Sequence, residues 1–213
     1  MKLNPVAKEI LEWVYCVIIA VALALTVRYF IGTPTVVQMP SMYPTLKPND
    51  RLVLNKLSRT FGSNYERGDI VTFEAPSIAN VSSTKANLEN PIAEYTNEPD
   101  NIFGKFVYYV LEIGKDSYIK RVIGLPGEHV KIENNKVYIN GKELDEPYLN
   151  EGVVTTARGT YVDIVVPEGT LFLMGDNRSN STDSRAFGCV PIERIESKVW
   201  IRFWPLNLFG KVE

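Results

Sequence analysis

A continuous apolar run near the N-terminus constrains this chain more than any other feature. Between Trp13 and Ile31 the sequence reads WVYCVIIAVALALTVRYFI, in which Arg28 is the one charged residue. As a helix this run spans about 28 Å, close to the hydrocarbon thickness of a bilayer. Arg28 lies near its far end, where a long side chain can reach the interface. The sequence therefore predicts a transmembrane helix over residues 13–31.

Two other interpretations of the run fit less well. A cleaved signal peptide has a shorter apolar core and a small-residue cleavage site, and the following GTPTVVQMP has no A-x-A pattern. A helix buried in a soluble core is rarely apolar on every face. Lys2 and Lys8 precede the run. We therefore expect a single-pass protein of the cell membrane, with residues 1–12 in the cytoplasm and residues 32–213 as an extracytoplasmic domain.

The remaining composition excludes several kinds of chemistry. The net charge is −2 and no basic stripe is visible, so we expect no nucleic-acid partner. One histidine, His129, and two cysteines, Cys16 and Cys189, cannot build an ordinary zinc site. A carboxylate-only metal site stays open but has no motif, and we expect neither metal nor cofactor. The length suits one anchor and one domain, which we expect to be a monomer.

After residue 34 the pattern changes to short β-rich runs separated by turn residues. Strands are predicted from TVVQM, RLVLNKL, DIVTFEA, VKIE, KVYI, two runs within TYVDIVVPEGTLFLMGDN, and KVWIRFWPL. The Asn134-Asn135 pair between VKIE and KVYI predicts a tight hairpin. We expect a mainly β fold, an irregular β-sandwich or barrel-like body with a smaller β region inserted at 128–170 and little helix beyond the anchor.

Residues 77–116 differ in character from these runs. A polar stretch, SIANVSSTKANLENPIAEYTNEPDN, is followed by the amphipathic and aromatic FGKFVYYVLEIG. We interpret the segment as a variable insertion or long excursion from the body. Its FVYYVL part is predicted to pack in the core as a strand, with contact to lipid as the alternative.

A serine and a lysine are the first candidates for chemistry. Ser41 lies in the proline-flanked turn PSMYP, where capping of the turn is the better interpretation for an isolated serine. Lys120 lies in the apolar run YIKRVIG, and strand alternation places it on the same face as Tyr118 and Val122. A lysine acts as a base only when neutral, which requires burial to lower its pKa by several units from about 10.4. On this segment alone, a surface lysine at a strand end is an equal alternative.

The loop GDNRSNSTDSRAFG is dense in short polar residues, which predicts a rigid polar shelf in which Asp183 and Arg185 are able to pair. A Ser-His-Asp triad is available only through His129, which follows a turn at the start of a predicted strand. Cys189 is the one cysteine outside the membrane and has no evident partner for nucleophilic chemistry. Both are weaker candidates than a serine and a lysine.

Five segments in this order resemble the type I signal peptidases, the bacterial leader peptidases, and most closely their one-span, Gram-positive-type members. The segments are the anchor, SMYPT, RGDIVTF, YIKRVIGLPGE and GDNRSNSTDSRAFG. The resemblance covers nearly the whole chain. It implies a serine endopeptidase in which Ser41 is acylated and Lys120 is its general base. Ser181 would orient the lysine amine, and an ion pair of Asp183 with Arg185 would support the site.

The same resemblance implies substrate and place. The enzyme would cut signal peptides from secretory preproteins after a small-x-small pattern, at the outer membrane surface and in contact with membrane lipids. The residues implied to line shallow pockets for small side chains are Val37, Met42, Leu46, Tyr118 and Ile119.

One position departs from the pattern. The family usually has a small residue two positions before the nucleophile, and in some members a hydroxyl there helps to hold the oxyanion. This chain has Met39 followed by Pro40, which leaves the backbone N–H of Ser41 and an unassigned second donor. Two rival functions remain. The apolar run opposes the soluble, DNA-binding, self-cleaving repressor-type peptidases that share the dyad. The second rival is a non-enzymatic membrane-anchored assembly factor, and Met39-Pro40 is the one feature that supports it.

Overall fold

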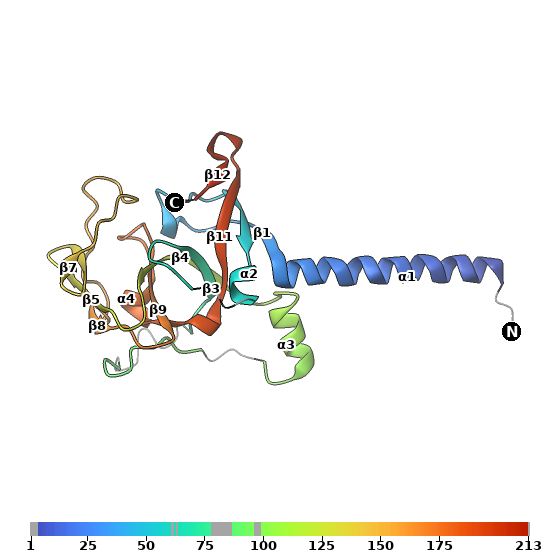
Figure 1. Ribbon diagram of the computed structural model, residues 1–213, viewed down its shortest axis with the longest axis horizontal. Coiled ribbons are helices and arrows are strands. Elements are labelled where there is room, and N and C mark those ends of the chain that lie inside the picture. The colour runs from blue at the N-terminus through green and yellow to red at the C-terminus, as the bar shows by residue number, and fades with distance from the viewer. Residues whose placement is uncertain (1–3, 61, 63, 78–86, 96–98, 213) are drawn as a thin grey trace.

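The structure, a computed structural model, describes residues 4–60, 62, 64–77, 87–95 and 99–212. A long N-terminal helix leads away from a body built mostly of strands (Figure 1). The body holds one larger and one smaller sheet. The prediction of a mainly β fold with a smaller β region and one apolar N-terminal helix is confirmed.

The N-terminal helix α1, Pro5–Thr26, continues as a π-helical turn, η1, Val27–Ile31. Asn4 caps its start by accepting a hydrogen bond from the Val6 N–H at 3.2 Å, and proline occupies the first position. No residue of either segment is buried against the body. In the described part of the chain, this is the one helix long and apolar enough to cross a membrane. It begins before the predicted span of 13–31.

The larger sheet has eight strands in the order β1-β2-β11-β3-β4-β9-β10, with β12 paired to β11. Neighbours pair antiparallel throughout. The strands are β1 Gly32–Val36, β2 Arg51–Asn55, β3 Ile70–Glu74, β4 Ser117–Gly124, β9 Thr170–Met174, β10 Val190–Pro191, β11 Ile195–Trp204 and β12 Gly210–Lys211. Strands β3 and β9 are buried along their whole length. The centre of the sheet is therefore covered on both faces, which is where β4 lies.

The smaller sheet has the order β7-β6-β5-β8. Its strands are β5 His129–Glu133, β6 Lys136–Ile139, β7 Lys142–Glu143 and β8 Asp163–Val165. Asn134 and Asn135 both take positive φ, 50° and 63°, between β5 and β6. This is the left-handed conformation that two-residue hairpin turns need and that asparagine tolerates, as the sequence predicted. The residues that join the two sheets in one apolar cluster include Ile123, Val130, Ile132, Phe172 and Met174.

Short helices complete the body. They are η2 Pro40–Met42, α2 Leu57–Thr60, α3 Ile102–Tyr109, α4 Ser184–Phe187, η4 Ile192–Arg194 and η5 Leu206–Leu208. The prediction of a core strand at FVYYVL is wrong, because its first four residues form the second half of α3. Asn101 starts this helix by accepting a hydrogen bond from the Gly104 N–H at 2.5 Å. The interpretation of 77–116 as an excursion falls partly on 78–86 and 96–98, which lie outside the described residues.

Candidate active site

Ser41 sits in the single turn of η2, and a second segment of the chain holds that turn in place. The Asn177 backbone N–H donates to the Ser41 carbonyl at 3.0 Å. The Asn177 side-chain amide donates to the Pro40 carbonyl, also at 3.0 Å. Both serine and turn are largely buried, while Met39 just before them is exposed. Asn177 was not singled out from the sequence, although it belongs to the polar loop that was.

Lys120 projects from β4 toward this serine. Its side chain is buried, with 3% of the residue exposed. The amine Nζ lies 2.8 Å from Ser41 Oγ and 3.1 Å from the Ile119 carbonyl. Burial lowers the pKa of Lys120 from its ordinary 10.5 to about 8, and the carboxylates of Asp183 and Asp176 oppose the change only in part. A hydroxyl and a basic amine are thus in direct hydrogen-bond contact in surroundings that exclude solvent.

Arg121, the next residue of β4, is buried on the opposite face. Its Nε and Nη2 donate to the two carboxylate oxygens of Asp176 at 2.9 and 2.8 Å. The Thr45 hydroxyl donates to the same carboxylate at 2.5 Å. This two-bond pair ties β4 to the polar loop and to the segment after Ser41. The pair was not predicted from the sequence, although a second basic residue in an apolar strand is a signal that could have indicated a buried ion pair.

Asp183 and Arg185 make a second buried ion pair within the polar loop. Arg185 Nε and Nη2 reach the two oxygens of Asp183, both at 2.8 Å. Asp183 also accepts from the Gly175 N–H at 3.1 Å, and Arg185 donates to the Arg178 carbonyl at 2.9 Å. The pair therefore fixes both ends of the loop that carries Ser181.

Ser181 lies against the serine turn with its hydroxyl unused. Its Oγ is buried and has no hydrogen-bond partner within the described part of the chain. A Cβ added at Gly175 would overlap both Ser181 Oγ and the Ser41 carbonyl, so a glycine is what lets these groups approach. The Lys120 amine bonds Ser41 and a backbone carbonyl instead of Ser181. The orienting role implied for Ser181 stays a prediction.

The residues implied to line substrate pockets fall into two groups. Val37, Met42 and Leu46 belong to one buried cluster, and Ile119 packs against its edge. Tyr118 packs against a different cluster, where its ring meets that of Phe73 edge-on at 6.1 Å. The first three support the serine turn from inside the body. Ile119 and Tyr118 are only half-buried, so they are the members of the set that solvent reaches.

The rival catalytic residues lie in unsuitable surroundings. His129 begins β5 in the smaller sheet, where its Nε2 is 2.6 Å from Asp163, and it makes no bond to Ser41. Cys189 is fully buried, and burial raises the pKa of its thiol to about 12. A histidine triad on Ser41 and a cysteine nucleophile are therefore both disfavoured.

A family model described as signal peptidase, peptidase S26, matches residues 10–204. The chain belongs to this peptidase family. The resemblance drawn from the sequence motifs is thereby confirmed. Signal peptidase IB of Staphylococcus aureus (strain COL) is 33% identical over 216 residues, covering 95% of this chain and 93% of that protein.

A relative from a different bacterial group is equally similar. Probable signal peptidase I-2 of Synechocystis sp. (strain ATCC 27184 / PCC 6803 / Kazusa) is 33% identical over 209 residues, covering 98% of this chain and 80% of that protein. Among solved structures, a signal peptidase I from Enterococcus faecalis V583 matches 63% of this chain and 96% of its own at 27% identity, with a TM-score of 0.38.

Proposed function

We propose that this protein is a membrane-bound serine endopeptidase that removes N-terminal signal peptides from secreted preproteins, cutting after a small-x-small sequence. The observation that carries the proposal is the buried Lys120 amine 2.8 Å from Ser41 Oγ. Its lowered pKa lets the amine accept a proton near neutral pH. Membership of a signal peptidase family supports the choice of substrate.

In the acylation step, neutral Lys120 takes the proton of Ser41 as Oγ attacks the carbonyl carbon of the small residue that precedes the cleaved bond. The resulting oxyanion accepts from the Ser41 backbone N–H, and Met39 has no side-chain donor to add. Lys120 then protonates the leaving amine, the peptide bond breaks, and the signal peptide remains as an ester on Ser41. In deacylation, Lys120 takes a proton from water as the water oxygen attacks the ester carbon. Lys120 then returns the proton to Ser41 Oγ as the ester bond breaks, which frees Ser41 and releases the signal peptide with a C-terminal carboxylate.

The residues around the dyad have supporting parts in this mechanism. Ser181 supplies a buried hydroxyl able to hold the amine once Ser41 is acylated. The Asp183–Arg185 pair keeps the loop of Ser181 in place. Val37, Met42, Leu46, Tyr118 and Ile119 form and back the pockets that select small side chains.

The membrane arrangement is also part of the proposal. Residues 13–31 cross the bilayer as one span, residues 1–12 stay in the cytoplasm, and residues 32–213 form the extracytoplasmic domain of a monomer. The exposed apolar surface of α1 supports the crossing, since nothing in the described body covers it.

The decisive experiment uses the full chain purified in detergent with a secretory preprotein. Wild type should release the mature protein, with cleavage after a small-x-small site mapped by mass spectrometry. Ser41→Ala should lose cleavage while its circular dichroism and melting temperature stay near wild type. Cleavage that persists in Ser41→Ala would remove Ser41 as nucleophile, and a folded wild type without activity would favour a non-enzymatic role.

A further inference from the structure

The helix α3 and the turn after it expose apolar side chains on one side of the body. The exposed fractions are 90% for Ile102, 74% for Phe103, 44% for Phe106 and 62% for Ile113. The two phenylalanines lie three residues apart and Ile102 lies four before Phe106, so these three share one helix face. Each such side chain gains about 1.5–3 kcal/mol when it leaves water. A contiguous set of this kind marks a contact surface.

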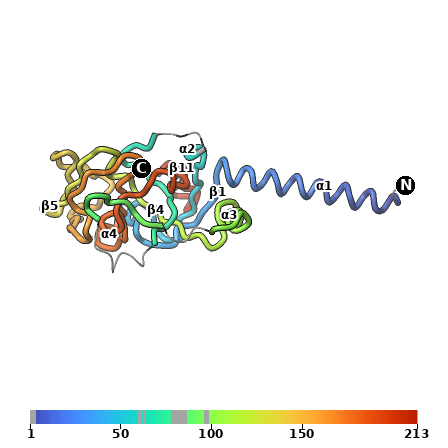
Figure 2. The backbone as a smooth tube through the Cα atoms, turned by 90° about the horizontal axis from the view of Figure 1, so that it is seen from below, coloured from blue at the N-terminus to red at the C-terminus, as the bar shows by residue number. Residues whose placement is uncertain are grey.

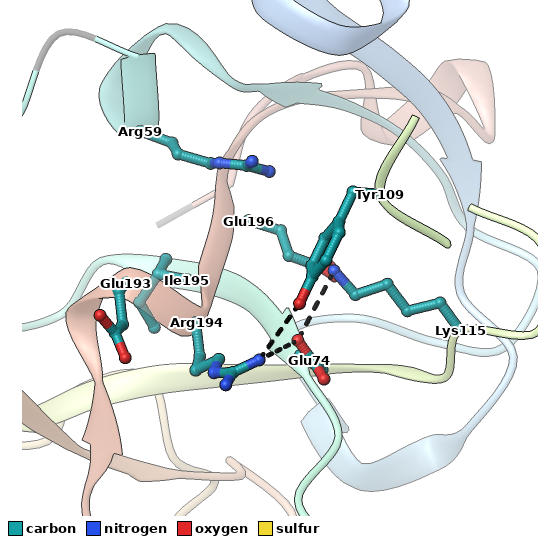
Figure 3. Close-up of a pocket in the computed structure, with 8 residues that line it drawn as sticks. All are labelled: Arg59, Glu74, Tyr109, Lys115, Glu193, Arg194, Ile195 and Glu196. Carbon is teal, nitrogen blue, oxygen red and sulfur yellow. Dashed lines mark hydrogen bonds and ion pairs between the residues drawn. The ribbon is translucent and has the colours of Figure 1, made fainter. Parts of the chain in front are cut away.

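The last turn of α3 is fixed to the body. The Tyr108 hydroxyl donates to Glu74 at 3.0 Å, and Arg194 donates to the Tyr109 hydroxyl at 3.4 Å. The Lys115 amine lies 5.5 and 5.1 Å from the centres of these two tyrosine rings. Figure 3 shows Arg194 and Lys115 reaching Glu74 from two sides of a cavity of about 380 Å³. With its tyrosines held, the helix cannot turn its apolar face inward.

The turn after α3 is clamped to the end of the apolar helix. Arg28, in η1, donates to the Leu111 carbonyl at 3.2 Å and to Glu112 at 3.0 Å. Lys56 bonds the other oxygen of Glu112 at 2.5 Å. Burial alone would raise the pKa of Glu112, but its bonds to Lys56 and Arg28 outweigh burial and lower it. The carboxylate therefore stays charged at neutral pH, and α3 keeps a fixed place relative to α1.

Figures 1 and 2 both place α3 beside the body end of α1, with α3 running across the direction of α1. A bilayer crossed by α1 therefore has its surface at the level of α3, and α3 lies along that surface. We propose that α3 is a second membrane contact, an interfacial helix that inserts Ile102, Phe103 and Phe106 at the headgroup–acyl boundary of the leaflet where α1 ends. This inference rests on the proposed crossing by α1.

The bilayer is the occupant that the surroundings favour. Phe30 and Ile31, at the body end of the apolar helix, are themselves exposed, so the apolar surface of the anchor continues toward α3. Lys105, on α3, is exposed and supplies a cation for lipid headgroups beside the apolar face. A second contact of this kind stops the body from rotating about α1. It holds the Ser41 turn at one height above the membrane.

Spin labels can test the contact in the full chain. In a Cys16→Ala background the remaining thiol, Cys189, is fully buried and does not react. A nitroxide is placed at Phe103→Cys, with Val165→Cys as the matched control. Val165 is 58% exposed on β8, at the end of the body opposite α1 (Figure 1). The protein is reconstituted in nanodiscs of phosphatidylglycerol and phosphatidylethanolamine that hold one copy each.

Lipid contact predicts that the label at 103 relaxes more with oxygen and less with a water-soluble nickel chelate than the label at 165 does. Equal exposure of both labels to the chelate would overturn the proposal. Shielding of the label at 103 only in discs that hold two or more copies would also overturn it, because the occupant would then be a second chain.

An activity measurement adds the functional consequence. The double variant Ile102→Ser/Phe103→Ser should hydrolyse a short soluble peptide in detergent at the wild-type rate. It should cleave a preprotein in liposomes several-fold more slowly, whereas Val165→Ser should match wild type in both assays. An unchanged liposome rate in the double variant would count against the contact. Inactivity of wild type itself would instead refute the proposed function, and the spin-label result would still decide the contact.

Discussion

Two neighbouring residues of β4 meet burial in opposite ways. Lys120 has a hydroxyl and a backbone carbonyl within hydrogen-bond distance, and none of the described carboxylates bonds its amine. Arg121, on the other face of the strand, has two bonds to Asp176. Both side chains are almost completely buried. The protein therefore pairs the cation that must stay charged and leaves unpaired the one that the proposed mechanism requires to lose its proton.

The contrast follows from the chemistry of the two side chains. A guanidinium cannot be deprotonated in a protein, so burial must be matched by a carboxylate. An ammonium can instead lose its proton, and burial without a paired carboxylate favours the neutral form. The same strand can thus supply a structural cation on one face and a base on the other.

The largest expected effect comes from giving position 120 a permanent cation like the one at position 121. Lys120→Arg keeps a basic residue but places a permanent cation next to Ser41. Because no neutral base remains, the rate of peptide hydrolysis should fall by about 10²–10⁴. Steady-state hydrolysis of a peptide substrate checks this, with Lys120→Met as an uncharged control that should be equally inactive. An arginine variant within tenfold of wild type would show that the residue does not act as the base.

Removing the carboxylate that pairs with Arg121 should lower the free energy of unfolding. Asp176→Leu leaves Arg121 buried without its carboxylate, and such losses typically cost about 3–5 kcal/mol. Chemical denaturation in detergent measures the change in free energy of unfolding. The double variant Arg121→Met/Asp176→Leu should recover most of the loss, because the unpaired charge is gone. A double variant as unstable as Asp176→Leu would mean that packing, and not charge, accounts for the cost.

The comparison also shows what the sequence can and cannot predict about this site. Ser41 and Lys120 were paired through the resemblance of their two local motifs to a peptidase family, and the structure brings them within 2.8 Å. The pairing of Arg121 with Asp176 depends instead on β4 lying in the covered centre of the sheet. That depends on the order of distant strands, which no local pattern records.

Local signals also misled at one element. The aromatic content of FVYYVL favoured a strand, since such residues are enriched in sheets. The structure has a helix there because Asn101 caps its start, and spacings of three and four then place Ile102, Phe103 and Phe106 on one exposed face. The cap was readable in the sequence. The attachment of the tyrosines to Glu74 and Arg194 was not, since it needs strand β3 and the turn η4 in place.

The unpaired lysine should itself destabilise the fold. Between its folded pKa of about 8 and its ordinary 10.5, the unfolded chain binds the proton that the folded chain has lost. Stability due to this group therefore rises with pH across that window, and the cost of a buried charged amine is complete below pH 8. Lys120→Met should gain up to about 3 kcal/mol at pH 7. Unfolding measured at pH 7 and at pH 10.5 checks this, because the gain should vanish at the higher pH.

In the proposed mechanism the same lowered pKa of Lys120 should set the pH dependence of catalysis. With a lysine pKa of about 8, kcat/KM should rise about tenfold per pH unit below 8 and level off above it. A stopped assay on a soluble peptide between pH 6 and 9.5 gives the profile. A plateau that extends down to pH 6 would mean that a different group with a lower pKa acts as the base.

The smallest effect is expected from a residue that touches neither the amine nor the reacting hydroxyl. Asn177→Ala removes the side-chain bond to the Pro40 carbonyl and keeps the backbone bond to Ser41. One hydrogen bond contributes about 1 kcal/mol, so kcat should fall about fivefold while KM changes little. Ser179→Ala is the matched control, because its exposed hydroxyl donates to Asn177 Oδ1 and leaves the Asn177 bond to the Pro40 carbonyl in place.

The pH profile separates positioning from base chemistry in this variant. If Asn177 only holds the serine turn, the midpoint near pH 8 should stay where it is in wild type, because the surroundings of the Lys120 amine are unchanged. A shifted midpoint would mean that the polar loop also determines how far solvent is excluded from the Lys120 amine. The different surroundings of the paired arginine and the isolated lysine would then depend on the polar loop that packs against β4 as well as on β4 itself.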